Sequence, residues 1–189
     1  METQHPKTPA ARPLRTAALA IAAGIALTLV TKVASAQNAA DPRVPDRSQT
    51  IKLSGPRVGL TFLTEETQDS LAAHGIEVGS VITQFGWQFE RQFLGKPGGL
   101  AALNEWIILI GGLDQGAFLP SVSWIVGVRG QGGAEIGVGP NVSAAGVGLV
   151  ASAGMTYRSS TMNIPLNFAV VPSKAGARVS IITGFTLNK

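Results

Sequence analysis

The chain lacks cysteine altogether and has only two histidines among its 189 residues. Without thiols it forms no disulfide, no thiolate metal site and no cysteine nucleophile. The usual zinc sites combine several cysteine and histidine ligands, so we expect no metal, and no motif points to another cofactor. Charged residues are also scarce, at 14% of the chain, and aromatic residues make up 6%, with a single tyrosine.

The N-terminal residues 1–36 have the pattern of an export signal rather than of a folded domain. Basic residues precede an apolar run, Ala17–Val30, and the small residues Ala34–Ala36 then precede Gln37. This order is typical of a cleaved secretory signal peptide. The alternative is a retained membrane anchor, but a spanning helix needs about 20 apolar residues. We therefore predict a bacterial exported protein with a signal at 1–36, a flexible polar leader at 37–49 and a folded domain at 50–189.

The positive charge of the chain comes mainly from this predicted signal. The formal net charge is +4. Once the signal is removed, 11 basic and 10 acidic residues remain, because the signal contains Glu2 and four basic residues, Lys7, Arg12, Arg15 and Lys32. Nucleic-acid-binding domains carry clustered basic residues within the fold. We therefore exclude nucleic acid as a partner.

From Thr50 onward, apolar and polar residues alternate, which is typical of β-strands. Only Thr64–Gly75 has a helical pattern, with Thr64 as a possible N-cap, acidic residues in the first turn and Gly75 as a stop. The sequence predicts an all-β fold, an up-and-down antiparallel β-barrel of about eight strands with this short helix in the first connection. The predicted strands are Ile51–Leu63, Glu77–Phe93, Asn104–Leu113, Ser121–Arg129, Ala134–Gly139, Ala145–Arg158, Thr161–Val171 and Ala177–Asn188.

The stretch Ile82–Gly95, "ITQFGWQFERQFLG", shows two unlike faces most clearly. One face is aromatic, and the other consists of glutamine, glycine and glutamate. In the other strands too, the second face carries mainly Gly, Ser, Thr, Asn and Gln, with too few charges for a surface in open water. We predict that the apolar face points outward to lipid. Its marker residues are Phe85, Trp87, Phe89, Trp124, Leu166 and Phe168.

The polar face is then the interior of the barrel. Eight strands enclose a space just wide enough for side chains to fill, and charged groups inside it must pair. We predict a polar network that plugs the lumen; the alternative is a narrow polar pathway. The predicted network consists of Arg57, Glu90, Glu105, Arg129, Glu135, Arg158 and Arg178.

The connections have a partial long-and-short alternation, as in transmembrane barrels. The predicted longer connections are the odd-numbered ones, which include Pro140–Ala144 and Pro172–Gly176. The second connection, Gly95–Leu103, is longer than this pattern requires. Within the seventh strand, Pro165 predicts a bulge, because proline cannot donate to the ladder.

With these features, residues 50–189 resemble the small eight-stranded bacterial outer-membrane barrels of the outer-membrane protein A and X classes. The resemblance rests on pattern and on no diagnostic motif. It implies an outer-membrane location, lipid as a partner, and a structural or surface-interaction function rather than a wide pore. The chain differs from such barrels in ending on "TLNK" after Phe185. Its aromatic belt is also thin, and Trp87, Trp106 and Trp124 are the candidates for it.

A soluble ligand-binding barrel and an enzyme are the alternative functions for this sequence. A soluble periplasmic or secreted barrel would pack the aromatic face inside and bind one apolar small ligand, as lipocalins do; an open sheet or a partner-dependent assembly is a further alternative. An enzyme would rest on Asp69, Ser70 and His74, which have the spacing of a nucleophile and a base. These are also ordinary surface residues, so we predict no catalytic site. The glycine-rich stretches lack the strand–glycine–helix order of a dinucleotide site.

Overall fold

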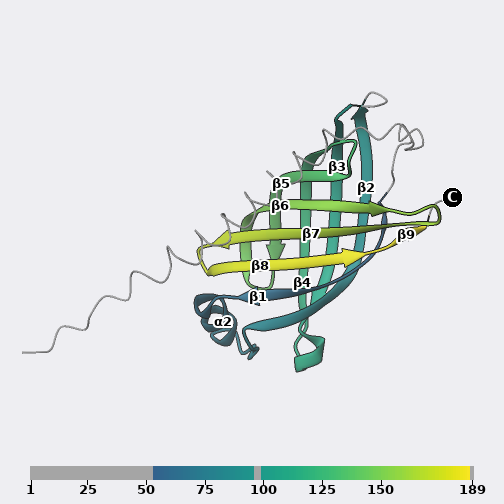
Figure 1. Cartoon of the computed structure of the whole chain (residues 1–189). Helices are drawn as coiled ribbons and strands as arrows, with labels where there is room; N and C mark the ends of the chain where they lie inside the picture. Colours follow the sequence, from purple (N-terminus) through teal and green to yellow (C-terminus); the bar gives the residue numbers. More distant parts are fainter. Residues whose placement is uncertain (1–52, 96–98, 188–189) are drawn as a thin grey trace, which may run out of the picture. The chain divides into compact units, whose positions relative to one another are not determined.

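The computed structural model describes residues 53–95 and 99–187. The predicted signal peptide and leader lie outside the described residues. Eight long strands and one very short strand follow each other along the chain (Figure 1). They are β1 (Gly55–Leu63), β2 (Val81–Gly95), β3 (Ala101–Gly111), β4 (Leu119–Arg129), β5 (Ala134–Ser143), β6 (Gly146–Arg158), β7 (Met162–Ser173), β8 (Gly176–Gly184) and β9 (Thr186–Leu187).

The strands form a closed antiparallel barrel. Each of β1–β7 pairs with the next strand, and β8 pairs with β7 on one side and with β1 on the other. The closing register runs from Arg57 opposite Gly184 to Leu63 opposite Arg178. The predicted fold class is therefore confirmed: an eight-stranded up-and-down barrel with one short helix, α2 (Glu65–Ala72), in the first connection. Closure also removes the unpaired edges of an open sheet.

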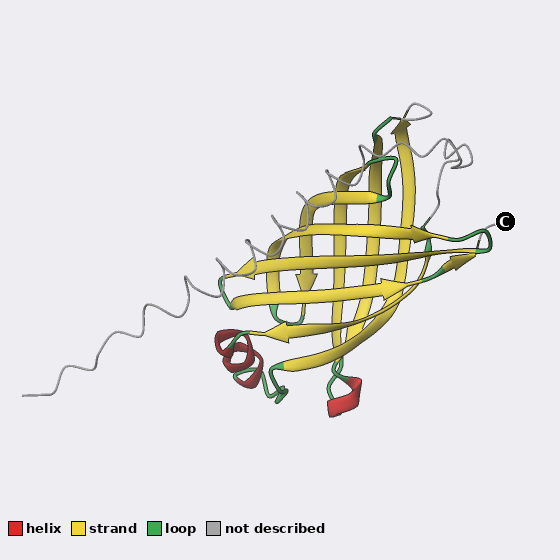
Figure 2. Ribbon diagram, viewed as in Figure 1, coloured by secondary structure: helices red, strands yellow, loops and turns green. Residues whose placement is uncertain are grey.

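The two ends of the barrel differ. Helix α2 and the 3-10 turn η1 (Leu113–Gln115) lie at the same end (Figure 2), which we call the helix end. We call the opposite end, where β1 begins and β8 finishes, the terminal end. At the close of α2, Gly75 has a φ of +78°, and the Ile76 N–H donates to the Leu71 carbonyl oxygen at 3.0 Å. This left-handed glycine ends the helix where the sequence predicts a stop.

Two of the predicted longer connections are wrong. Strand β5 continues through Pro140 to Ser143, and β7 continues through Pro172 to Ser173, so each turn at the helix end that follows them has only two residues, 144–145 and 174–175. Pro140 lies on the outer face of β5, where its missing N–H only interrupts the pairing with β4 between Asn141 and Val138. A proline in such a position does not end the strand.

The expected bulge at Pro165 is also wrong. The β6–β7 register passes through the pair Thr156–Pro165 without a shift. Strand β7 pairs with β8 up to Leu166 and then with β9 at Asn163 and Met162, so the proline lies at the change of partner, where no ladder donor is required. The register shift lies instead in the β2–β3 pair, between Gln92 and Leu94.

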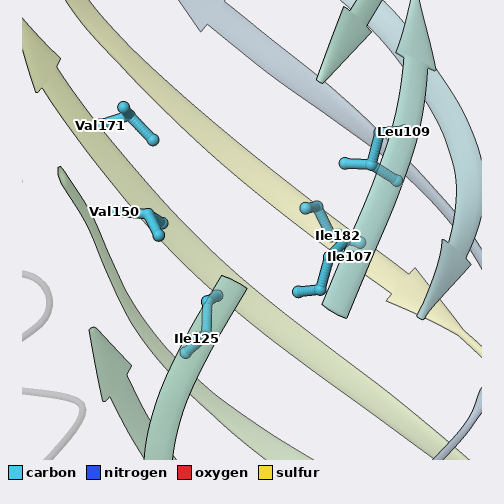
Figure 3. Close-up of a cluster of buried hydrophobic side chains, with 6 residues drawn as sticks. All are labelled: Ile107, Leu109, Ile125, Val150, Val171 and Ile182. Carbon is cyan, nitrogen blue, oxygen red and sulfur yellow. The ribbon is translucent and has the colours of Figure 1, made fainter. Parts of the chain in front are cut away.

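The interior holds an aliphatic layer that the predicted polar lumen did not include. Six buried side chains from β3, β4, β6, β7 and β8 form this aliphatic layer (Figure 3): Ile107, Leu109, Ile125, Val150, Val171 and Ile182. The apolar character of both faces of the third predicted strand was the one signal for it. Burial of these side chains from water stabilises the barrel from within.

The helix end is closed by a second apolar cluster. Leu71 of α2 is almost fully buried and packs in one cluster with inward-facing residues from β1, β2, β4 and the β5–β6 turn, which are Leu63, Ile82, Leu119 and Ala145. Helix α2 also contacts β8, where Gly176 lies against Thr67. The first connection therefore folds back over the mouth of the barrel.

Inward-facing glycines allow the strands to curve this tightly, and Gly86 on β2 tests the point. A Cβ atom at Gly86 would lie 1.9 Å from the Ile108 carbonyl oxygen on β3. We expect Gly86→Ala to lower the free energy of unfolding by about 3 kcal/mol, the upper end of the cost of overpacking, because backbone rather than a flexible side chain must move. Urea titration of the refolded chain measures this. Gly79→Ala is the control, since its nearest neighbour, Gln115 Oε1, is at 3.4 Å; equal losses would contradict the explanation.

Candidate functional site

The charged residues of the barrel strands are sorted almost entirely to the inside. Alternation along the strands places seven of them inward and leaves Arg91, which is exposed on β2, as the one outward-facing charge in β1–β8. The seven inward residues are those of the predicted network: Arg57, Glu90, Glu105, Arg129, Glu135, Arg158 and Arg178. Six of them belong to two separate groups rather than to one continuous network.

The first group, the Arg129 cluster, lies toward the terminal end. Arg129 on β4 is 2% exposed. Its Nη1 and Nη2 donate to the two carboxylate oxygens of Glu90 on β2, at 2.7 and 2.6 Å, and its Nε donates to Glu135 Oε2 on β5 at 2.7 Å. Glu105 Oε1 on β3 lies 3.7 Å from Nη2. One guanidinium thus joins three carboxylates from three strands, with the two-pronged geometry that makes arginine–carboxylate pairs strong.

A glutamine joins a second arginine to this cluster. Arg57 Nε on β1 donates to Gln88 Oε1 at 2.9 Å, and Gln88 Nε2 donates to Glu105 Oε1 at 3.0 Å. Arg57 also donates to the carbonyl oxygens of Pro56 and Leu53. The cluster therefore spans five neighbouring strands, β1–β5, with every charged member hydrogen-bonded. Such a chain of charge-assisted hydrogen bonds stabilises one register of these strands relative to each other.

The second group, the Arg178 cluster, lies toward the helix end. Arg178 on β8 is 7% exposed and donates to Ser143 Oγ and, at 3.0 Å, to Asn141 Oδ1. Asn141 Nδ2 in turn donates to Ser121 Oγ at 2.9 Å and to Ser123 Oγ at 2.8 Å. The aliphatic layer separates the two clusters: on β4, for example, Ile125 lies between Ser123 and Arg129. Arg158, the last residue of β6, is half-buried and faces inward toward the terminal end.

A small cavity lies inside the barrel between the two clusters. Its volume is about 50 Å³, and both Arg178 and Glu105 line it, together with the aliphatic layer. A water molecule needs roughly 10–15 Å³ of such space, so the cavity has room for a few water-sized groups. Asn167 Oδ1 and Arg178 Nε, both from residues that line the cavity, are buried without a hydrogen-bond partner in the structure.

Two of the titratable groups that lie outside the strands at the helix end are His74 and Asp114. His74 Nδ1 lies 2.7 Å from the backbone carbonyl oxygen of Ser70, not from its hydroxyl, and the histidine is exposed. The Thr83 hydroxyl donates to Asp114 Oδ1 at 2.6 Å, and this bond lowers the pKa of the exposed Asp114 carboxyl. Within 53–95 and 99–187, no group of three or more His, Cys, Asp or Glu residues is placed to hold a metal ion.

The outer wall carries the predicted apolar face. Phe85, Trp87 and Phe89 on β2 are 49%, 46% and 51% exposed. Trp124 and Leu166 are also exposed, and Phe168 is half-buried. Trp106 and Trp124 stack with ring centroids 6.0 Å apart and lie at the middle of β3 and β4, not at strand ends. Trp106 and Trp124 therefore form a stacked pair in the middle of the outer wall rather than a belt at one end of the barrel.

Sequence reasoning did not find the polar neutral residues of the site. Gln88 joins Arg57 to Glu105, and Asn141 joins Arg178 to two serines, yet all lie on faces described only as small and polar. The sequence predicts Asn141 in a loop because Pro140 indicates the end of a strand, whereas β5 continues to Ser143. Its alternation with Glu135 on the same face was the available signal, since residues of one face are an even number of positions apart.

Comparisons with known proteins add the following. No family model matches the chain, and no curated protein matches it. A solved structure from work on the de novo design of transmembrane β-barrels is similar, with a TM-score of 0.40 and 13% identity, over 73% of this chain and 99% of that chain. Among the described residues, no helix is long and apolar enough to cross a membrane. The chain is therefore characterised by its own fold, a closed eight-stranded antiparallel barrel.

Proposed function

We propose that this chain is a small bacterial outer-membrane barrel of structural or surface-interaction type, with lipid around its outer wall and a lumen closed by side chains. In this proposal residues 1–36 direct export, and the barrel has no catalytic machinery, metal or cofactor. The proposed partners are membrane lipid and, at the exposed loops, another molecule of unassigned kind.

The observation that carries the proposal is the inverted distribution of polarity. Outward positions on the eight strands carry mainly aliphatic and aromatic side chains, with Arg91 as the one charge and Asn104 as an amide among them, whereas the other arginine and glutamate residues of the strands face inward with Gln88 and Asn141. Monomers that are stable in water rarely expose a continuous apolar surface of this kind. In a transmembrane barrel the same alternation, apolar outward and polar inward, is the rule.

Polar groups on the outer wall support the same assignment. The Trp124 indole N–H donates to Asn104 Oδ1 at 2.8 Å, so the outward-facing donor and amide satisfy each other. Arg91 pairs with Asn104 in the β2–β3 register, next to the register shift between Gln92 and Leu94. Hydrocarbon offers no hydrogen bonds, so an outer polar group needs a partner on the wall or a position close to the interface.

The closed lumen supports a structural role over a pore. The Arg129 cluster, the aliphatic layer and the Arg178 cluster follow one another inside the barrel, and Leu71 closes the helix end. The remaining cavity of about 50 Å³ is far smaller than the pockets that hold drug-sized ligands. The soluble ligand-binding alternative requires Phe85, Trp87 and Phe89 inside, whereas each is about half exposed.

Fractionation and gel mobility test the proposal together. After expression of the full chain in a Gram-negative host, we expect the protein in the outer-membrane fraction, with different gel mobility before and after boiling. Closed barrels resist the gel detergent until heated because every strand is paired. The urea-treated sample is the unfolded control. Recovery of a folded, detergent-free monomer from the periplasm would overturn the membrane assignment while leaving the fold intact.

A further inference from the structure

Arg178 is a buried cation of the lumen whose own cluster contains no carboxylate. No glutamate or aspartate of the described residues forms an ion pair with it; its bonds go to the neutral groups of Ser143 and Asn141. The three inward-facing glutamates are all gathered around Arg129. A buried charge without a counter-charge is costly, because its lost hydration is not replaced. The position therefore calls for an anion.

The formal charge of the whole lumen has the same sign. The strands direct four arginines inward (Arg57, Arg129, Arg158 and Arg178) and three glutamates (Glu90, Glu105 and Glu135). One positive charge remains when all pairs are made. Because the Arg129 cluster holds two arginines and three glutamates, the positive excess lies outside it, at Arg158 and Arg178.

The hydrogen-bond directions around Arg178 leave donors on the residues next to it, although Glu105 and the unpartnered acceptor Asn167 Oδ1 belong to the same cavity lining. A guanidinium only donates, so Asn141 must present its oxygen to Arg178 and its Nδ2 to Ser121 and Ser123. Both serine oxygens therefore accept, and their own O–H groups remain as donors. Ser121, Ser123, Asn141 and Arg178 all line the cavity, and Arg178 Nε is a buried donor without a partner in the structure.

We propose that Arg178, Ser121 and Ser123 bind a small monovalent anion, chloride or another halide, inside the barrel. Arg178 supplies the charge and the Nε donor, and the two serine hydroxyls supply further donors. A cavity of about 50 Å³ accommodates a monatomic ion with a few waters and no organic anion of ordinary size. The site depends only on the lumen, so it holds whether the outer wall faces lipid or water and extends beyond the proposed function.

Chloride-dependent stability tests the site on the full chain. The purified protein is unfolded with urea in sodium chloride and in sodium gluconate at equal ionic strength, which separates specific binding from screening. A ligand that binds only the folded state stabilises it in a saturable way. We expect the urea midpoint of the wild type to rise with chloride and then level off. Arg178→Gln should lose the whole of this rise, and Arg178→Lys should keep part of it.

Arg91→Gln is the matched control, because it removes one arginine from the outer face of the same barrel. It should show the wild-type chloride response. Absence of a saturable response in the wild type, or an undiminished response in Arg178→Gln, would overturn the proposal. If the glutamine variant does not fold, wild-type crystals grown in sodium bromide decide the question. An anomalous bromide peak within hydrogen-bond distance of Arg178 Nε supports the site, and its absence contradicts it.

Discussion

Replacing Arg129 with methionine is expected to lower the free energy of unfolding by about 3–5 kcal/mol, the cost of removing one partner from a buried ion pair. The reason is that Glu90 and Glu135 lose the guanidinium from which both accept hydrogen bonds, and Glu105 loses the nearest positive charge at 3.7 Å. Urea titration of the folded barrel measures the loss.

Two further variants separate this explanation from a simple loss of packing. The triple variant Arg129→Met, Glu90→Gln, Glu135→Gln leaves Arg57, Gln88 and Glu105 as a balanced group. It should recover most of the lost stability, because replacing a complete buried ionic group is far less costly than breaking it. Arg91→Gln, on the exposed outer face, should change stability by no more than about 0.5 kcal/mol. A triple variant as unstable as Arg129→Met would show that packing, not charge, sets the effect.

Replacing Phe89 with arginine should be nearly as damaging if the outer wall faces lipid. An arginine at the midplane of a bilayer destabilises a transmembrane barrel by about 2–4 kcal/mol. Phe89 on β2 pairs with Trp106 on β3, and Trp106 pairs with Trp124 on β4. Because Trp106 and Trp124 are the central residues of their strands, this row of side chains crosses the middle of the wall. Refolding into lipid vesicles followed by denaturant titration measures the cost.

Position along the strand is the control for this second experiment. Val81 is the first residue of β2 and is also exposed on the outer face. Near the interface an arginine costs only about 0–1 kcal/mol, so Val81→Arg should be nearly neutral, and Phe89→Leu should remain close to the wild type. Equal, small effects at Phe89 and Val81 would count against a lipid-facing wall, since in water both positions accept arginine.

The candidate site was predictable in its members but not in its partners. Alternation alone assigned Arg57, Glu90, Glu105, Arg129 and Glu135 to one face, because side chains two apart on a strand point the same way. It did not show that Arg129 binds Glu90, 39 positions away, or that Arg178 binds Asn141, 37 positions away. Which inward residues meet depends on the stagger between strands, and a period of two contains no information on stagger.

The local exceptions were missed for related reasons. Pro140 and Pro172 indicate turns by residue type, but each lies at a position where the absent N–H interrupts little, so the strands continue. The β2–β3 register shift near Phe93 follows an ordinary alternating sequence, with no proline or glycine at that position. The aliphatic layer could not be predicted from single strands, because its six residues come from five strands. Its prediction requires the positions of these strands relative to each other.

Residue order alone is enough to predict strands with one apolar and one polar face, about eight in number, with a short helix after the first. These properties are local, since they follow from residue order along each strand. The tertiary structure decided the rest: the pairing of β1 with β8 that closes the barrel, the gathering of three glutamates on Arg129, and the isolation of Arg178 beside a cavity. Closure fixes the stagger of every strand relative to its neighbours, and this stagger decides which buried charges are close enough to pair.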